Sequence, residues 1–171
     1  MTLPGLESEI RSATFSPDER YRYDLLRSWG EGPIALWVML NPSTADATQD
    51  DPTIRRCRAF SRREGAGGLV VVNLFAFRAT RPTKLLAQRD PVGPDNEARI
   101  EHWLGNPDVG LVIAAWGQWR DAQPLKPRCP DVARLAADAD VAMHCLGRTK
   151  EHGSPRHPLY VRANKALEVY P

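Results

Sequence analysis

Four short apolar runs constrain the fold of this chain more than any other feature of its sequence. Each run is nearly uninterrupted rather than alternating between apolar and polar residues, which is typical of strands buried on both faces of a parallel sheet. The gaps between the runs carry helical patterns, so the sequence predicts a three-layer α/β/α domain around a four-stranded parallel sheet. The predicted strands are Ile34–Leu40, Leu69–Phe75, Val109–Trp116 and Val141–Leu146.

The other predicted elements have recognisable ends. Asp51-Pro52 is typical of an N-cap followed by proline at the first helical position. Ahead of the first strand, the turn at Ser16-Pro17-Asp18 predicts an antiparallel hairpin beside the sheet. We therefore expect one α/β domain over residues 1–171, with residues 1–32 as the hairpin extension and residues 33–171 as the core. Further helices are expected over Asp95–Gly105, over Pro130–Asp138, and from His157-Pro158 to about Val169.

Composition bounds the class of protein. Apolar residues make up 42% and charged residues 26% of the sequence, and the net charge is +2, which are ordinary values for a soluble globular protein. No apolar run is long enough to span a bilayer. The N-terminal segment MTLPGLESEIR lacks the basic start and apolar stretch of a secretory signal. We expect a cytoplasmic monomer that does not contact a membrane.

Cysteine and histidine spacing gives no sign of a metal centre. The three cysteines are an odd number without a C-x-x-C pair, which argues against a disulfide framework and against a zinc or iron–sulfur site. The four histidines show no metal-binding spacing either. We expect the protein to use no metal ion and no other cofactor. The residues concerned are Cys57, Cys129, Cys145, His102, His144, His152 and His157.

Positive charge is concentrated in two segments. Residues 55–63 contain five arginines, and residues 147–165 contain five cations against one acid. Such patches are compatible with a phosphate-bearing partner, and they are equally common on solvated helices. The cations of the second patch are Arg148, Lys150, Arg156, Arg162 and Lys165.

Polar side chains gather where the predicted strands end, and in parallel sheets ligands bind at the carboxyl ends of strands. Asn73 is the clearest case because it interrupts the run LVVVNLF. A buried amide without partners costs about 1–3 kcal/mol, so Asn73 needs hydrogen-bond partners. One interpretation is that it ties down a neighbouring loop. The other is that it reads the edge of a nucleobase, with Phe75 or Phe77 stacking on the base.

Other candidates at this edge also have two interpretations. Asn41 can serve a reaction or simply form the turn before Pro42, with Ser43 beside it. His157 can act in catalysis or cap the last helix, and Asp46 can serve the site or cap a turn. No Ser–His–Asp arrangement follows from spacing, and no glycine-rich phosphate loop is present in the sequence.

The motifs MLNPS, VVVNLFAF, LVIAAWG and GSPRHPLY, in this order, resemble the uracil-DNA glycosylase superfamily. The resemblance implies strand order 2-1-3-4 and a base pocket at the strand ends. It implies that Asn41, with or without help from Asp46, positions the attacking water, and that Asn73 reads the base. His157 would bond the base carbonyl as the base departs. The first motif lacks the aspartate of the fastest branch, and the last reads His-Pro-Leu rather than His-Pro-Ser.

A wider set of motifs is similar to an uncharacterised bacterial and phage family, a domain of unknown function. This similarity covers roughly residues 13–168. Its marks are YRYDLLRSW, MLNPSTADATQDDPTIRRC, NLFAFRAT, AAWG and CLGRTKEHGSPRHPLY.

Taken together, these features lead us to expect a metal-independent DNA N-glycosylase that removes uracil or a modified base from an extrahelical position. Ser43 and Phe75 or Phe77 would line the base pocket with Asn73. Two alternatives stay open: a non-catalytic module that binds a nucleotide or nucleic acid in the same pocket, and a protein–protein adaptor whose arginine helix is merely solvated. The residues expected to hold the DNA backbone are Arg148, Lys150, Arg156 and Ser154.

Overall fold

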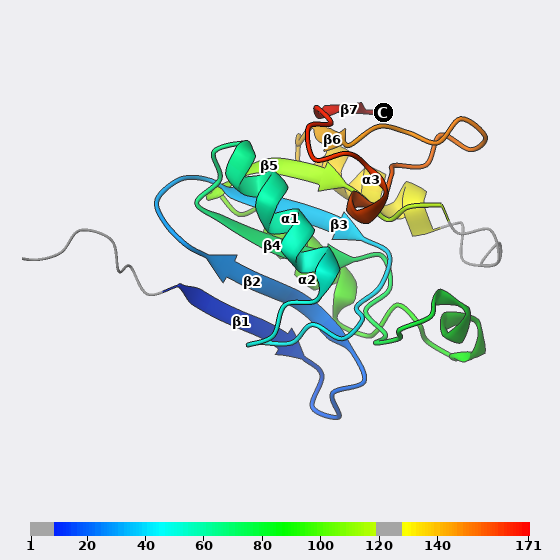
Figure 1. Ribbon diagram of the computed structural model, residues 1–171. Helices are drawn as coiled ribbons and strands as arrows, with labels where there is room; N and C mark the ends of the chain where they lie inside the picture. Colours follow the sequence, from blue (N-terminus) through cyan, green and yellow to red (C-terminus); the bar gives the residue numbers. More distant parts are fainter. Residues whose placement is uncertain (1–8, 119–127) are drawn as a thin grey trace, which may run out of the picture.

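The computed structural model describes residues 9–118 and 128–171 of the protein. Within these ranges, seven strands form one mixed sheet in the order β1-β2-β4-β3-β5-β6-β7 (Figure 1). β3, β4, β5 and β6 are parallel to one another, whereas β1, β2 and β7 join the sheet in antiparallel pairs. The strands are β1 (Ile10–Phe15), β2 (Arg22–Ser28), β3 (Ile34–Met39), β4 (Gly68–Asn73), β5 (Val109–Ala114), β6 (Met143–Cys145) and β7 (Glu168–Tyr170).

The predicted fold class is therefore wrong, because the sheet is mixed and has seven strands rather than four parallel ones. Strand β2 is central to this error. It pairs with β4 inside the sheet, yet it carries the buried charged residues Arg22, Asp24 and Arg27. The predicted hairpin is present, since β1 and β2 pair in antiparallel fashion. A search for apolar runs cannot show that β2 lies inside the sheet, because the signal of a buried strand is apolar side chains.

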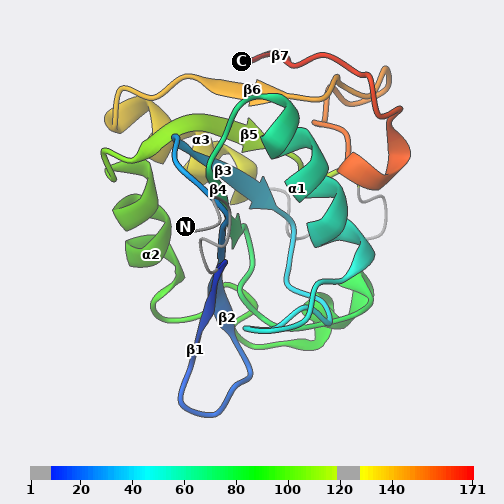
Figure 2. The same cartoon turned by 60° about the vertical axis from the view of Figure 1, so that its left-hand side comes forward.

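Helices cover both faces of the sheet (Figure 2). α1 (Pro52–Arg63) packs Ile54, Cys57 and Phe60 on one face, around the fully buried Trp37. The other face is covered by α2 (Asn96–Leu104) and α3 (Arg128–Asp138). The chain also contains a 3₁₀ helix, η1 (Pro82–Ala87). Burial of both faces explains why β3 and β4 are almost uniformly apolar. The predicted N-cap of α1 is confirmed, since the Asp51 carboxylate accepts a hydrogen bond from the Ile54 N–H.

The prediction of a helix from His157-Pro158 to Val169 is wrong. Only a short 3₁₀ helix, η3 (Pro158–Tyr160), follows His157, and the chain then extends into β7. Arginines of α1 hold this segment. Arg56 donates to the carbonyl oxygens of Pro158 and Val161, and Arg63 donates to those of Ala163 and Lys165. These carbonyl groups are thus bonded to side chains instead of to the amides of a helix.

The arginine patch of residues 55–63 is used inside the molecule. Arg55 donates to the Asp50 carbonyl, and Arg62 lies over the Trp29 ring with its guanidinium 4.9 Å from the ring centroid. Arg58 binds the Asp50 carboxylate at 2.9 Å. With the bonds of Arg56 and Arg63 to the C-terminal segment, every arginine of the patch contacts its own chain, which removes the main reason to expect a phosphate there.

A buried ion pair fixes the loop between β3 and α1. The Arg27 side chain is fully buried, and its Nε lies 2.7 Å from Asp50 Oδ1. Arg27 also donates to the carbonyl oxygens of Asp46 and Leu26, at 2.7 and 2.8 Å. Burial raises the pKa of Asp50, but the bonds from Arg27 and Arg58 outweigh it and hold that pKa below its ordinary value. The loop that follows Asn41 is thereby tied to β2 and α1.

We expect Asp50→Ala to lower the free energy of unfolding by about 3–5 kcal/mol, because it leaves the buried Arg27 guanidinium without its counter-ion. Urea unfolding followed by circular dichroism measures the change. The matched control is Glu64→Ala. It removes the ion-pair partner of Arg63, which is more exposed than Asp50, and should change the free energy of unfolding by less than about 1 kcal/mol. Equal effects of the two substitutions would contradict this account of the loop.

Candidate functional site

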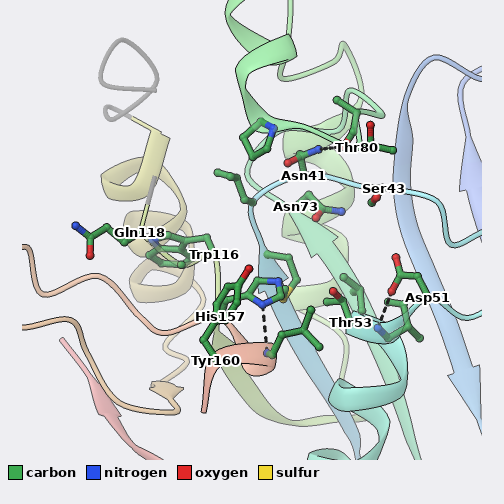
Figure 3. A pocket seen from close by; sticks show the side chains of 18 of the residues that line it. Asn41, Ser43, Asp51, Thr53, Asn73, Thr80, Trp116, Gln118, His157 and Tyr160 are labelled. Atoms are coloured by element: carbon green, nitrogen blue, oxygen red, sulfur yellow. Dashed lines mark hydrogen bonds between the residues drawn. The ribbon is translucent and has the colours of Figure 1, made fainter. Parts of the chain in front are cut away.

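A cavity of about 550 Å³ lies at the carboxyl ends of β3, β4 and β5 (Figure 3). Its volume is in the range of small-ligand pockets. The end of β3 contributes Asn41 and Ser43, and β4 contributes Asn73. Trp116 follows β5, and His157 comes from the loop held against α1. The cavity also includes Arg22, Asp51, Thr53, Gln118, Thr149, Arg156 and Tyr160.

Asn73 is buried in the wall of this cavity with its amide unpaired. Asn73 is 1% exposed, and neither its Nδ2 nor its Oδ1 has a hydrogen-bond partner within the described residues. The neighbouring Asn96 donates to the backbone carbonyl of Asn73, at 2.9 Å, and not to its side chain. An unpaired buried amide costs about 1–3 kcal/mol, so a ligand that supplies both an acceptor and a donor would relieve that cost.

His157 presents a neutral imidazole. Its Nδ1 accepts a hydrogen bond from the Leu159 N–H at 3.2 Å, which assigns the proton of the neutral ring to Nε2. Burial lowers the pKa of His157, and the nearby Asp51 charge opposes this shift only in part. At neutral pH the ring is therefore uncharged and can donate a hydrogen bond from Nε2.

Asn41 and Asp46 have separate surroundings. Asn41 lines the cavity, and its Nδ2 donates to the carbonyl oxygens of Ala79 and Pro42, at 2.7 and 3.0 Å. These bonds fix the amide and leave Oδ1 without a partner in the described part of the chain. Asp46 is not part of the cavity lining, because its Oδ1 accepts from the N–H groups of Gln49 and Thr48. These turn bonds lower the pKa of Asp46.

The phenylalanines expected to stack on a base lie elsewhere. Phe75 is 2% exposed within the apolar core, and Phe77 packs against the same core with its ring edge-on to Tyr21. Neither belongs to the cavity lining, whereas Trp116 and Tyr160 do. The cause is the chain direction after β4, since the Phe75 N–H bonds to the Leu40 carbonyl and turns this segment into the core.

A second hollow, of about 690 Å³, adjoins the cavity and shares Arg156 and Tyr160 with it. Four cations and one acid, Glu168, line this hollow. Lys150 and Ser154 line neither space; the Ser154 N–H bonds to Thr149 Oγ1 at 3.2 Å. We call this the basic hollow; its cations are Arg148, Arg156, Arg162 and Lys165.

Sequence reasoning missed two charged residues of the cavity. Arg22 is 2% exposed, donates from Nη1 to the Ala45 carbonyl, and has no partner for Nε within the described residues. Burial lowers the pKa of Arg22 to about 10, so it stays cationic at neutral pH. Asp51 caps α1, as its sequence pattern predicts, but it also lines the cavity. An arginine within the strand sequence RYDLLRS is the signal that marks Arg22 as unusual.

Two kinds of site are absent from residues 9–118 and 128–171. No group of three or more His, Cys, Asp or Glu side chains in these ranges is arranged to hold a metal ion. None of the helices there is both long and apolar enough to cross a membrane.

The comparisons with known proteins identify a family. A family model described as a protein of unknown function, DUF1643, matches residues 22–159. The chain belongs to the DUF1643 family. The DUF1643 match begins at Arg22 and includes every cavity residue named above except Tyr160. No curated protein and no solved structure matches the chain significantly, so the resemblance to uracil-DNA glycosylases gains no support from these comparisons.

We expect His157 to make stability depend on pH in mild acid. Its pKa in the folded protein is below the unfolded value of about 6.5, so its contribution is complete above that pH and is lost as pH falls through the folded pKa. Relative to His157→Gln, which cannot titrate, the wild-type free energy of unfolding should decline in this window. Urea unfolding at a series of pH values measures the difference. A difference that stays flat or grows in acid would contradict the assignment.

Proposed function

We propose that the cavity receives one nucleobase of a DNA strand and that the protein hydrolyses the N-glycosidic bond of that base. The observation that carries the proposal is Asn73, whose buried amide has both its donor and its acceptor unpaired, among the described residues, at the cavity wall. Uracil and related bases present a carbonyl oxygen next to an N–H, which is the complement of an amide. Enzymes that act on a base read it through such hydrogen bonds after extruding it from the stack.

Aromatic rings and space in the cavity support the same ligand. Trp116 and Tyr160 supply ring surfaces at the cavity, and bases commonly stack on such rings. Tyr160 is 78% exposed, with its ring centroid 5.5 Å from that of His157, whereas Trp116 is 4% exposed and packs edge-on against Tyr170. A volume of about 550 Å³ leaves room for the sugar beside the base.

In the proposed reaction, the bond between the sugar C1′ and the base nitrogen breaks, and its electron pair leaves with the base. His157 Nε2–H donates to the base carbonyl oxygen as negative charge develops there. A fixed donor of this kind typically contributes about 3–4 kcal/mol to lowering the barrier. Water then forms the new bond to C1′ and releases a proton, and the departing base gains one. In this proposal Asn41 Oδ1 accepts a hydrogen bond from this water, and the two bonds of its amide nitrogen support the role by fixing the side chain.

A second candidate is a module that binds the base without hydrolysing it. The placement of Asp46 favours this alternative, because the carboxylate expected to help activate water is engaged by its own turn and lies outside the cavity. Calorimetric binding of nucleosides, combined with no base release from oligonucleotides, would support the module over the enzyme.

We expect Asn73→Leu to abolish base release while leaving stability unchanged or higher. Leucine has nearly the shape of asparagine and removes an unpaired buried amide, so folding loses no hydrogen bond. Base release from single-stranded and duplex oligonucleotides carrying uracil or modified bases should fall by about 100-fold or more. Urea unfolding of the same variant reports stability.

Asn96→Leu is the matched control, because this buried amide bonds the backbone at the end of β4 and is not part of the cavity lining. Asn96→Leu should lower the free energy of unfolding by about 1–3 kcal/mol and keep base release, whereas Asn73→Leu should keep stability and lose base release. The proposal is wrong if wild-type protein releases no base from the whole panel and binds no nucleoside.

We propose that the basic hollow binds the DNA phosphates. We expect the double variant Arg162→Ala, Lys165→Ala to weaken binding of a DNA oligonucleotide and to reduce the slope of log affinity against log salt concentration by about 1–2. Fluorescence anisotropy at several salt concentrations measures both. Arg134→Ala, at a 66% exposed position on α3 outside either space, is the control and should leave the slope unchanged. Equal slopes for the wild type, the double variant and the Arg134→Ala control would rule out the basic hollow as the phosphate-binding site.

A further inference from the structure

Asp51 is the one acidic side chain among the described residues that line the cavity. It precedes α1, and in Figure 3 it lies in the cavity wall beside Thr53 and across from Asn73. Its position matters because glycosidic bond hydrolysis in proteins commonly uses a carboxylate to activate water. The other carboxylate suggested by the sequence, Asp46, lies outside the cavity.

Capping of α1 uses only half of the Asp51 carboxylate. Oδ1 accepts the hydrogen bond from the Ile54 N–H at 2.9 Å. Oδ2 has no hydrogen bond within residues 9–118 and 128–171, and no lysine, arginine or histidine nitrogen of these ranges lies close enough to form an ion pair with Asp51. In Figure 3 this second oxygen points away from the helix, in the direction of Ser43. One oxygen therefore fixes the group and the other is free to bind a water molecule.

The charge of Asp51 acts on two other residues of the cavity. It raises the pKa of Arg22, from β2, and that of His157, from the loop beside η3, against the larger opposite effect of burial in both cases. The carboxylate thus lines the same cavity as the group that would bond the departing base, and its charge acts on that group. The amides at the start of α1 favour a negative charge at this place, and the bond from the Ile54 N–H orients the carboxylate.

We propose that Asp51 is the catalytic carboxylate of the hydrolysis, with its free Oδ2 binding the attacking water. This inference rests on the proposed function. As the bond from C1′ to the base nitrogen breaks, the water oxygen bonds to C1′ and the water proton passes to Asp51. The base leaves with the electron pair and takes its proton from solvent. The negative carboxylate also stabilises the positive charge that develops on the sugar.

The test uses Asp51→Asn, because asparagine caps a helix as well as aspartate does but carries no charge. The side-chain oxygen of the introduced amide would keep the bond to the Ile54 N–H, so the urea midpoint should stay at the wild-type value. Base release should fall by about 100-fold or more, while affinity for the same oligonucleotide changes by less than about threefold. Asp51→Ala, which also loses the cap, should lose both base release and stability.

Asp46→Asn is the matched control, since it changes a neighbouring carboxylate that lies outside the cavity. It should release base at the wild-type rate. If Asp51→Asn also keeps the wild-type rate, Asp51 is only a helix cap: the inference is wrong and the proposed function stands. If wild-type protein releases no base from any oligonucleotide, the proposed function fails and the catalytic role of Asp51 fails with it.

Discussion

The ion pair between Arg27 and Asp50 is the interaction on which the cavity depends. The cavity needs the segment after β3 to lie across the strand ends, and this segment has few apolar side chains to hold it there. Arg27 supplies the attachment from inside β2, bonding the Asp50 carboxylate and the Asp46 carbonyl, and Arg58 binds the same carboxylate from α1. Buried charges are stable only when paired and hydrogen-bonded, so the loop, the strand and the helix require one another.

The same chemistry recurs at the other side of the cavity. Arg56 and Arg63 hold the carbonyl groups of the segment after His157, so arginines of α1 position both loops that meet at the cavity. This division of work changes the meaning of the positive charge. The arginines of residues 55–63 hold the fold together. The cations of the basic hollow line open space, and two of them, Arg148 and Lys165, share the single acid Glu168.

Local sequence patterns predict much of the cavity lining and less of the fold. The start of α1 is predictable, because an Asp-Pro cap is a local signal. Strand β2 is not recognisable as part of the sheet, because its buried Asp24 and Arg27 are bonded by residues far away in the chain. At the cavity, Asn41, Ser43, Asn73 and His157 come together, since strand ends meet at one edge. Asp46, Phe75 and Phe77 do not, because their directions depend on tertiary bonds that local pattern cannot specify.

Helix α1 has Asp51 as its N-cap, and its Arg56 side chain holds the segment after His157 by hydrogen bonds. One helix thus fixes the spacing between the Asp51 carboxylate and the His157 imidazole. If α1 slid or tilted, Asp51 and His157 would move together, and the distance between them would stay nearly constant. Side chains that rotate about their own bonds can still adjust to an incoming molecule. Tyr160, the most exposed of the large hydrophobic side chains described, has the most room to do so.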